Sequence, residues 1–246
     1  MPNVNNNLPD HIAFIMDGNG RWSNKRNLTI EKGHKKGLET AENISEICDK
    51  LGIKYITLYA FSTENWKRSE DEIAGLFKLI EYFFKNKIKK IIKRKSRINI
   101  IGDISKFPAN TKKYIKKAVS DTKTFKNKVI NIALNYGSRA EIIRATKLII
   151  NDINKNKILL KNVNESNFNN YLYTKNIPDP DLLIRTAGEY RISNFLLYQI
   201  AYSELYITKT LWPDFNKDDI QKALNSYKKR NRKFGGRKWL KGFYLR

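Results

Sequence analysis

The chain has 246 residues, 41% of them hydrophobic and 12% aromatic, with 48 Lys and Arg against 24 Asp and Glu and a formal net charge of +24. The hydrophobic content excludes an intrinsically disordered chain, and the length suffices for a sizeable core, so we expect one domain over 1–246 with flexible tails at 1–10 and 237–246. Cys48 is the only cysteine, which excludes an intrachain disulfide and a cysteine-based zinc site.

Short apolar runs alternate with amphipathic helical patterns along the whole chain. The apolar runs predict six strands, at 11–17, 54–60, 97–102, 128–135, 181–186 and 204–207. The helical patterns predict helices at about 34–50, 70–94, 109–124, 138–153, 166–172 and 217–231. This alternation is typical of an α/β fold with a central, mostly parallel six-stranded sheet and helices on both faces.

The first apolar run stops at an acid, in the sequence DGNGRW over 17–22. A buried strand that ends this way places the Asp17 carboxylate at the edge of a sheet. Gly18 and Gly20 have no Cβ, so the backbone can turn sharply there and approach a ligand closely. A carboxylate beside bare amides and a guanidinium suits a phosphorylated substrate that carries a metal ion.

The helical pattern at 70–94 is apolar along one face and rich in lysine on the other. Its simplest interpretation is a helix that packs on the core. Two alternatives stay open: it forms the wall of an apolar cavity, or its basic end over 85–95 lies on a membrane surface.

Polar residues follow three further strand-like runs, in FSTENWKR over 61–68, NYGSR over 135–139 and RTAGEYRISN over 185–194. Ligands of a parallel sheet bind beyond the carboxyl ends of its strands, so we expect these segments to converge. Arginines, serine hydroxyls and glycine amides are donors that suit a diphosphate, and a carboxylate such as Asp17 can hold Mg²⁺. The phosphate-binding loop of nucleotide hydrolases, GxxxxGK[ST], is absent from the sequence.

Each of these residues also has a purely structural interpretation. Trp22 and Trp66 are of a type more often found in a core than on a ligand. Arg185 and Arg191 could form surface ion pairs with Glu189. Only the convergence of several such residues at one sheet edge favours a functional site.

The chain resembles the undecaprenyl diphosphate synthases, the bacterial cis-prenyltransferases, over nearly its whole length. Several motifs in fixed order carry the resemblance, at 11–22, 33–37, 57–68, 100–103, 131–137, 181–195, 201–206 and 211–215. It implies a Mg²⁺-dependent enzyme that adds isopentenyl diphosphate repeatedly to an allylic primer, usually farnesyl diphosphate, with Z double bonds. It also implies a homodimer and a hydrophobic tunnel for the growing chain.

The resemblance also assigns roles by position. Asp17 matches the catalytic carboxylate that positions Mg²⁺, and Glu204 matches a second metal carboxylate. The allylic diphosphate would be held by the segment from Asp17 onward and by the histidine of the second motif, that is by Gly18, Asn19, Gly20, Arg21, Trp22 and His34.

For isopentenyl diphosphate, the resemblance assigns Asn65 as a catalytic residue beside the proton that leaves C2. An amide is a poor base, so orientation of a water or of the departing diphosphate is an equal interpretation. The remaining substrate-binding positions come from the second and fifth strand ends, namely Ser62, Thr63, Glu64, Trp66, Arg68, Arg185, Arg191, Ile192 and Ser193. The segment 232–236 resembles a tail that reaches a neighbouring active site.

Two positions depart from the family pattern. Ile30 stands where the family usually has an arginine that contacts the allylic diphosphate, so Lys25, Arg26 or Lys32 replaces it or primer binding is weaker. Ala187 replaces the first glycine of the usual RTGGE, which would stiffen that loop.

Rival interpretations start from the charge of +24. Drift in an AT-rich genome explains it best, because Lys, Asn and Ile are all frequent; docking on an anionic membrane is the alternative. We expect no nucleic-acid partner, since the tryptophans flank Gly, Asn and Arg instead of interleaving with basic strands. A catalytically silent subunit is disfavoured because Asp17, Asn65 and Glu204 are retained. No long uncharged apolar run and no secretory signal is present, so we expect a cytoplasmic protein.

Overall fold

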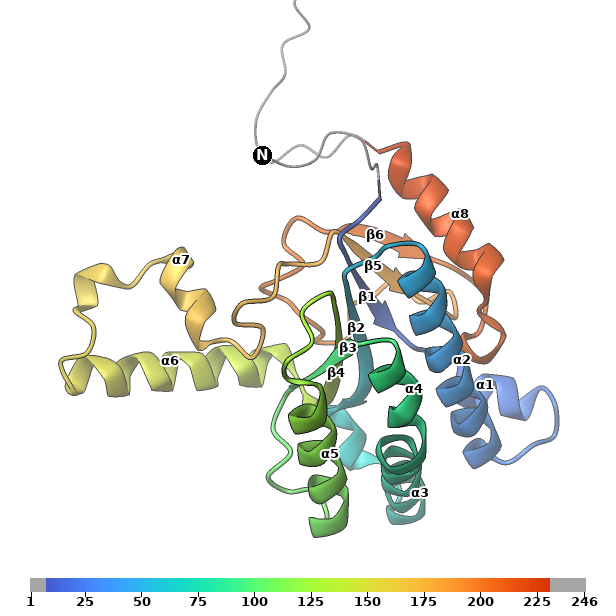
Figure 1. Cartoon of the computed structure of the whole chain (residues 1–246). Coiled ribbons are helices and arrows are strands. Elements are labelled where there is room, and N and C mark those ends of the chain that lie inside the picture. The colour runs from blue at the N-terminus through green and yellow to red at the C-terminus, as the bar shows by residue number, and fades with distance from the viewer. Residues whose placement is uncertain (1–7, 231–246) are drawn as a thin grey trace, which may run out of the picture.

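Six strands form one sheet in which every neighbouring pair is parallel (Figure 1). The computed structural model describes residues 8–230. The spatial order is β3-β4-β2-β1-β5-β6, so the first strand lies near the centre. The strands are β1 (His11–Ile15), β2 (Tyr55–Ser62), β3 (Ser96–Ile101), β4 (Lys128–Tyr136), β5 (Leu182–Arg185) and β6 (Glu204–Ile207). All six predicted strands are confirmed, within two residues at each end.

The main helices also lie where the periodicity predicts them. They are α2 (Ile30–Lys50), α3 (Glu70–Tyr82), α4 (Ile88–Lys93), α5 (Ala109–Thr122), α6 (Ser138–Asn154), α7 (Glu165–Phe168) and α8 (Lys217–Lys228). Short 3₁₀ turns stand at η1 (Thr63–Lys67), η3 (Leu160–Asn162), η4 (Asn169–Tyr171) and η5 (Trp212–Asp214). The tails at 1–7 and 237–246 and the segment 232–236 lie outside the described residues.

Three local features differ from the prediction. A short helix, α1 (Asn19–Asn24), directly follows Gly18, because a six-residue helix is too short to show a period in the sequence. Helix α2 begins four residues early, since the Thr29 hydroxyl accepts the amide of Lys32 and caps its first turn. The predicted helix 70–94 is interrupted by a π-turn, η2 (Phe83–Lys87), which apolar spacing alone does not reveal.

The sheet buries both faces, but unequally. Alternate residues of β1 point to opposite sides, so Ile12 and Phe14 join one apolar cluster while Ala13 and Ile15 join another. The larger cluster receives side chains from α2, α3, α4, α5 and α8. The smaller cluster is closed by the segment 192–200, and α6 runs outward beside it with α7 beyond (Figure 1). Both faces are therefore covered, as the α/β pattern predicts.

A buried histidine closes the amino edge of the sheet. His11 is 1% exposed; its Nδ1 donates to the carbonyl of Pro178 at 2.7 Å, and its Nε2 accepts from the Thr57 hydroxyl at 2.7 Å. Burial lowers the pKa of His11 from 6.5 to about 4, despite the opposing effects of the Pro178 hydrogen bond and the Asp181 charge. The ring is therefore neutral in the folded protein at neutral pH.

This histidine should make stability depend on pH. In the unfolded chain His11 binds a proton below pH 6.5, whereas in the fold it does so only below about 4. The contribution is fully favourable above pH 6.5 and is lost as the pH falls toward 4, by up to about 3 kcal/mol. Urea unfolding at pH 7 and pH 4.5 should show a smaller pH-dependent loss for His11→Gln than for the wild type. Equal losses in the two proteins would contradict this prediction.

Candidate functional site

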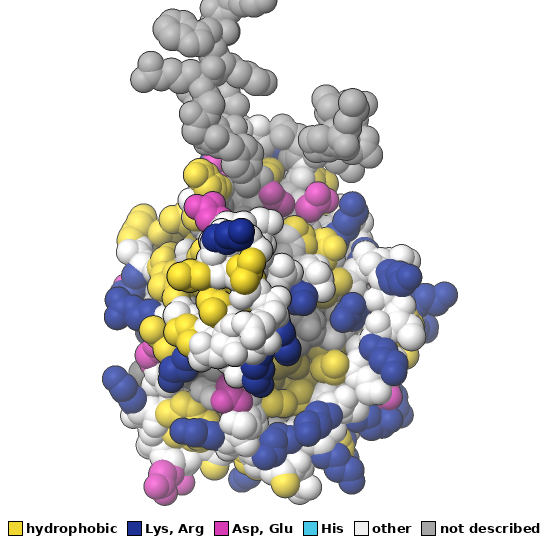
Figure 2. Space-filling model, turned by 90° about the vertical axis from the view of Figure 1, so that its left-hand side faces the viewer, with side chains coloured by type: hydrophobic (Ala, Val, Ile, Leu, Met, Phe, Trp, Pro, Cys, Tyr) yellow, Lys and Arg dark blue, Asp and Glu magenta, His cyan; other side chains and the backbone are white. Residues whose placement is uncertain are grey.

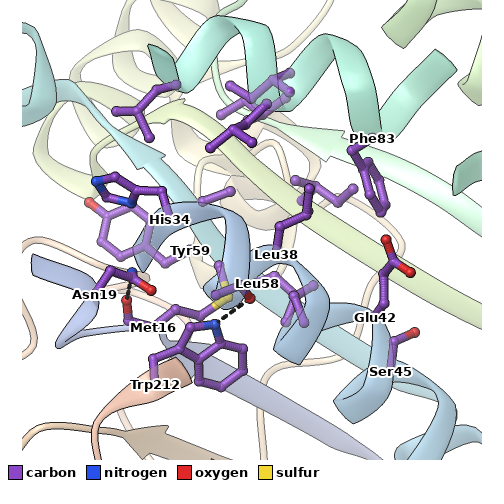
Figure 3. Close-up of a pocket in the computed structure, with 18 of the residues that line it drawn as sticks. Met16, Asn19, His34, Leu38, Glu42, Ser45, Leu58, Tyr59, Phe83 and Trp212 are labelled. Carbon is purple, nitrogen blue, oxygen red and sulfur yellow. Dashed lines mark hydrogen bonds between the residues drawn. The ribbon is translucent and has the colours of Figure 1, made fainter. Parts of the chain in front are cut away.

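A cavity of about 650 Å³ lies between helices α2 and α3 on the larger face of the sheet. Its middle is walled by apolar side chains from both helices and from β2 and β4, among them Leu38, Leu58, Leu76, Ile80 and Ile132. Figure 3 shows Asn19 and His34 toward one end, and Glu42, Ser45 and Phe83 toward the other. The cavity is thus an apolar channel with polar groups at its ends.

The cavity opens at the carboxyl edge of the sheet, and we call this end the mouth, formed by Asp17, Ser62, Asn65, Arg185 and Ser193. These residues end or follow β1, β2 and β5, three strands that are neighbours in the sheet. The predicted convergence of strand ends is therefore confirmed for these five residues. Asn19, His34, Glu64 and Arg68 also line the cavity.

An ion pair between neighbouring strands occupies the mouth. The Arg185 guanidinium, on a residue that is 4% exposed, donates from Nη2 to Asp17 Oδ2 at 2.7 Å. Its Nη1 donates to the Ser193 hydroxyl at 2.8 Å and to the backbone carbonyl of Arg191 at 2.5 Å. Its Nε is buried and has no hydrogen-bond partner among the described residues.

The turn after β1 depends on one glycine. Gly18 has φ +108°, and a Cβ there would stand 2.9 Å from Leu211 Cδ2 and 3.1 Å from the Ala187 methyl. The Thr186 hydroxyl accepts the Asp17 amide at 2.9 Å and donates to the Asp17 carbonyl at 2.7 Å. These contacts fix the backbone that presents the Asp17 carboxylate.

Ala187, which stands where the family usually has glycine, lies beside the Gly18 turn. Its φ is +71°, in the left-handed region that a glycine would occupy without strain. Its amide donates to Thr210 and its carbonyl accepts from Arg21, so both backbone groups are held.

Asn65 closes the turn after β2. Its side-chain oxygen accepts the Ser62 amide at 2.9 Å, and the Ser62 side chain caps the same 3₁₀ turn. The Asn65 oxygen is therefore engaged with the backbone, which favours orientation over proton acceptance for this amide.

His34 enters the cavity from the first turns of α2. Its Nε2 donates to Glu72 Oε1 at 3.3 Å, and Arg68 donates to the same oxygen at 2.7 Å. Burial lowers the pKa of His34, although the hydrogen bond to Glu72 opposes this effect. A neutral imidazole thus lies near the mouth at neutral pH.

Several predicted site residues make structural contacts outside the cavity lining. Trp66 donates to Asn135 at 2.8 Å and packs with Phe61 and Phe77. Trp22 donates to Asp214 at 2.6 Å.

A second group of predicted residues lies at the surface near the mouth. Glu189 accepts from Arg21 at 3.0 Å and from Arg191 at 2.6 Å, so the ion-pair alternative describes Arg191 but not Arg185. The cavity lining also omits Gly18, Gly20, Thr63 and Ile192.

Glu204 lies far from Asp17 within one chain. In the parallel register Ile15, Arg185 and Ile207 are level, and Glu204 precedes Ile207 by three residues, or about 10 Å. Asp17 lies beyond that level on the other side. The Glu204 carboxylate accepts from Arg230 at 2.8 Å. The structure therefore does not bring the two proposed metal carboxylates together.

Many cavity residues received no role from the sequence, and Asn194 and Trp212 are two of them. Asn194 lines the mouth, and Trp212 lines the wall with its indole donating to the Gly37 carbonyl at 2.8 Å. Asn194 and Trp212 fall inside the motifs at 181–195 and 211–215. The sequence therefore indicated that these segments belong to the site, but not that these two side chains reach the cavity.

Comparison with known proteins finds close similarity over almost the whole chain. A family model described as "Putative undecaprenyl diphosphate synthase" matches residues 15–235. An isoprenyl transferase of Clostridium perfringens is 52% identical over 233 residues, covering 95% of this chain and 92% of that protein. An isoprenyl transferase of Bacillus subtilis is 44% identical over 229 residues, covering 93% and 88%. The structure of lavandulyl diphosphate synthase from Lavandula x intermedia, in complex with dimethylallyl diphosphate, matches with a TM-score of 0.90 at 34% identity, covering 94% of this chain and 99% of that one.

The glycine turn can be tested by stability alone. Gly18→Ala should destabilise the fold by about 1–3 kcal/mol, because it combines an unfavourable φ with a steric overlap at Leu211. Gly20→Ala is the matched control, since a Cβ there meets no atom within 4 Å and the position is helical, so its stability should be unchanged or rise by up to about 1 kcal/mol. Chemical denaturation measures both. Equal effects of the two substitutions would show that the turn does not depend on Gly18.

Proposed function

Because the chain belongs to the undecaprenyl diphosphate synthase family and is a prenyltransferase of isoprenoid biosynthesis, we propose that it is a cis-prenyltransferase that adds isopentenyl diphosphate repeatedly to farnesyl diphosphate. The product is a long-chain Z-polyprenyl diphosphate. We assign it as undecaprenyl diphosphate, the precursor of a lipid carrier for cell-wall polysaccharide; a different chain length is the alternative.

One observation carries this proposal: a cluster of diphosphate-binding groups stands at the open end of an apolar cavity. A prenyl diphosphate has the same division, with a charged head and a long hydrocarbon chain. The head suits the donors at the mouth, and the chain suits the wall formed by Leu38, Leu58 and Ile80. We therefore assign the cavity as the hydrophobic tunnel.

The mouth provides separate groups for two diphosphates. We assign the allylic primer to the β1 side, where Asp17, the turn over 18–21 and His34 lie. We assign isopentenyl diphosphate to the groups at the ends of the two strands that flank β1, namely Ser62 on β2 and Arg185 and Ser193 at and after the end of β5. This arrangement brings both reacting carbons to one mouth, which raises their effective concentration.

The condensation breaks the allylic C–O bond, and the diphosphate leaves with the bonding electrons. The double bond of isopentenyl diphosphate then forms the new C–C bond, and the released diphosphate takes the proton that leaves C2. A fixed cation such as Arg21 stabilises the charge that develops on the departing oxygens. Asn65 orients the turn beside C2, and the apolar wall keeps water from the carbocation-like centre.

The residues at the mouth fit Mg²⁺ only as an ion that is shared with substrate. Among residues 8–230, no three His, Cys, Asp or Glu side chains are grouped as a metal site. Mg²⁺ in phosphate-binding sites takes one or two carboxylates and completes its shell with phosphate oxygens and waters. Asp17, 28% exposed in its side chain, would be that carboxylate, and the bound ion would neutralise charge on the leaving diphosphate.

The outward face of α6 is the surface that we assign to a homodimer. Ile143 and Ile150, which are two helical turns apart and so on one side of α6, are exposed there. Figure 2 shows hydrophobic side chains among scattered Lys and Arg on the side from which α6 and α7 project.

The scatter of the cations supports compositional drift more than one membrane-binding stripe.

We propose a cytoplasmic enzyme that contacts the inner membrane face only peripherally. In the part of the chain that the structure describes, no helix has the length and apolarity of a membrane span.

The reaction itself is the first test. The purified chain, with farnesyl diphosphate, labelled isopentenyl diphosphate and Mg²⁺, should form extended products that chromatography can size. Asp17→Asn keeps the shape of the side chain but removes its charge, so the rate should fall about 10²–10³-fold. Asp121→Asn removes a carboxylate on α5 outside the cavity and should keep the wild-type rate. No extension by the wild type would refute the proposed function.

The departure at Ile30 gives a second test. Ile30 begins α2 and is 44% exposed, so an arginine fits there. Arg26 already pairs with Asp214 and stacks on Trp22, which leaves Lys25 and Lys32 as replacements. If neither lysine contacts the primer, Ile30→Arg should lower the KM for farnesyl diphosphate several-fold. An unchanged KM would mean that a neighbouring lysine already supplies the charge.

A further inference from the structure

Asn194 joins three segments that surround the mouth. Its backbone carbonyl accepts the Ser138 amide at 2.8 Å, and its side-chain oxygen accepts the Arg139 amide at 2.9 Å. Its side-chain nitrogen donates to Glu64 Oε1 at 2.9 Å. Asn194 thus contacts the start of α6 with two groups and the turn after β2 with a third.

The first of these contacts replaces a missing helix cap. Helix α6 is preceded by Gly137, which has no side chain to cap the helix. A Cβ at position 137 would stand 2.4 Å from the Thr63 hydroxyl and 2.8 Å from the Asn194 side-chain nitrogen. The glycine therefore lets the segments approach, and Asn194 caps the helix from a different loop.

The backbone around Asn194 is held in an uncommon conformation. Ser193 has φ +47° and Asn194 has φ +60°, two successive residues in the left-handed region. Such residues cost of order 1–3 kcal/mol each unless their surroundings hold them, although asparagine tolerates the region better than most. Phe195 is fully buried and stacks on Tyr59 at 4.3 Å, which fixes the segment from the next residue.

These contacts lead to one inference about the reaction. We propose that Asn194 is a positioning residue that sets the separation between the two loops around isopentenyl diphosphate, the Ser62–Asn65 turn and the Ser193 segment that Arg185 holds. This inference rests on the proposed function. Asn194 acts through Glu64, and its own contact with substrate is not required.

The electrostatics of Glu64 agree with this role. Burial opposes the charged form of Glu64, but hydrogen bonds, that from Asn194 foremost, hold the pKa of its carboxyl below the ordinary value. Glu64 therefore needs a donor at this place, and an acceptor there would repel it.

The test exploits this requirement. Asn194→Asp keeps the oxygen that caps α6 but places an acceptor against Glu64. We expect the KM for isopentenyl diphosphate to rise at least tenfold, with the KM for farnesyl diphosphate within twofold. In a Glu64→Gln background, the glutamine amide can donate to the introduced carboxylate, so the same change should cost less than threefold. Asn110→Asp, an exposed site in the first turn of α5, controls for the added charge and should change neither constant.

A fold effect and a failure of the proposed function give different results. Asn194→Gly keeps the backbone conformation, loses both side-chain contacts, and should raise the same KM without rescue by Glu64→Gln. Calorimetric binding of isopentenyl diphosphate without primer gives a readout independent of turnover, and Asn194→Asp should weaken it at least tenfold. An equal cost of Asn194→Asp in both backgrounds, or no cost in either, would overturn the positioning role. A wild type that binds isopentenyl diphosphate but extends no primer would refute the proposed function alone.

Discussion

The buried guanidinium of Arg185 is the constraint on which the mouth depends. A charge this far from water needs a partner of opposite charge, and Asp17, just after the neighbouring strand, supplies it. The segment after β5 must then fold back, so that the Arg191 carbonyl and the Ser193 hydroxyl accept hydrogen bonds from Nη1 of Arg185. One ion pair therefore fixes two loops that are more than 160 positions apart in sequence, as the separation of 168 between its partners shows.

The cost of burying a charge also divides the cavity into a charged end and an apolar interior. Beyond the ion pair, leucines and isoleucines of α2 and α3 line the cavity. Burial of a charged group among them would be unfavourable, so the charged group of a ligand stays at the mouth. A cavity divided in this way suits an amphiphile whose charged head lies at the mouth. Specific contacts at the mouth decide only which head group is accepted.

Much of this could be predicted from the sequence, because strand and helix periods and the glycine turn are local signals. Asp17, Ser62 and Arg185 were identified because they end strands, and parallel strands must bring such residues to one edge. The sequence did not reveal that Glu204 lies far from Asp17. A motif match gives the order of residues along the chain, but not how far along its strand each residue lies in the sheet. Asn194 had no role because its three partners come from segments that only the tertiary structure brings together. The π-turn was missed because its apolar residues keep near-helical spacing.

The π-turn at Phe83–Lys87 has a consequence for the wall of the cavity. Its residues Phe83, Phe84 and Lys87 line the wall, between two regular helical segments on the same side. The wall on this side of the cavity is therefore two regular helical segments that meet at a wider turn, and not one continuous α-helix.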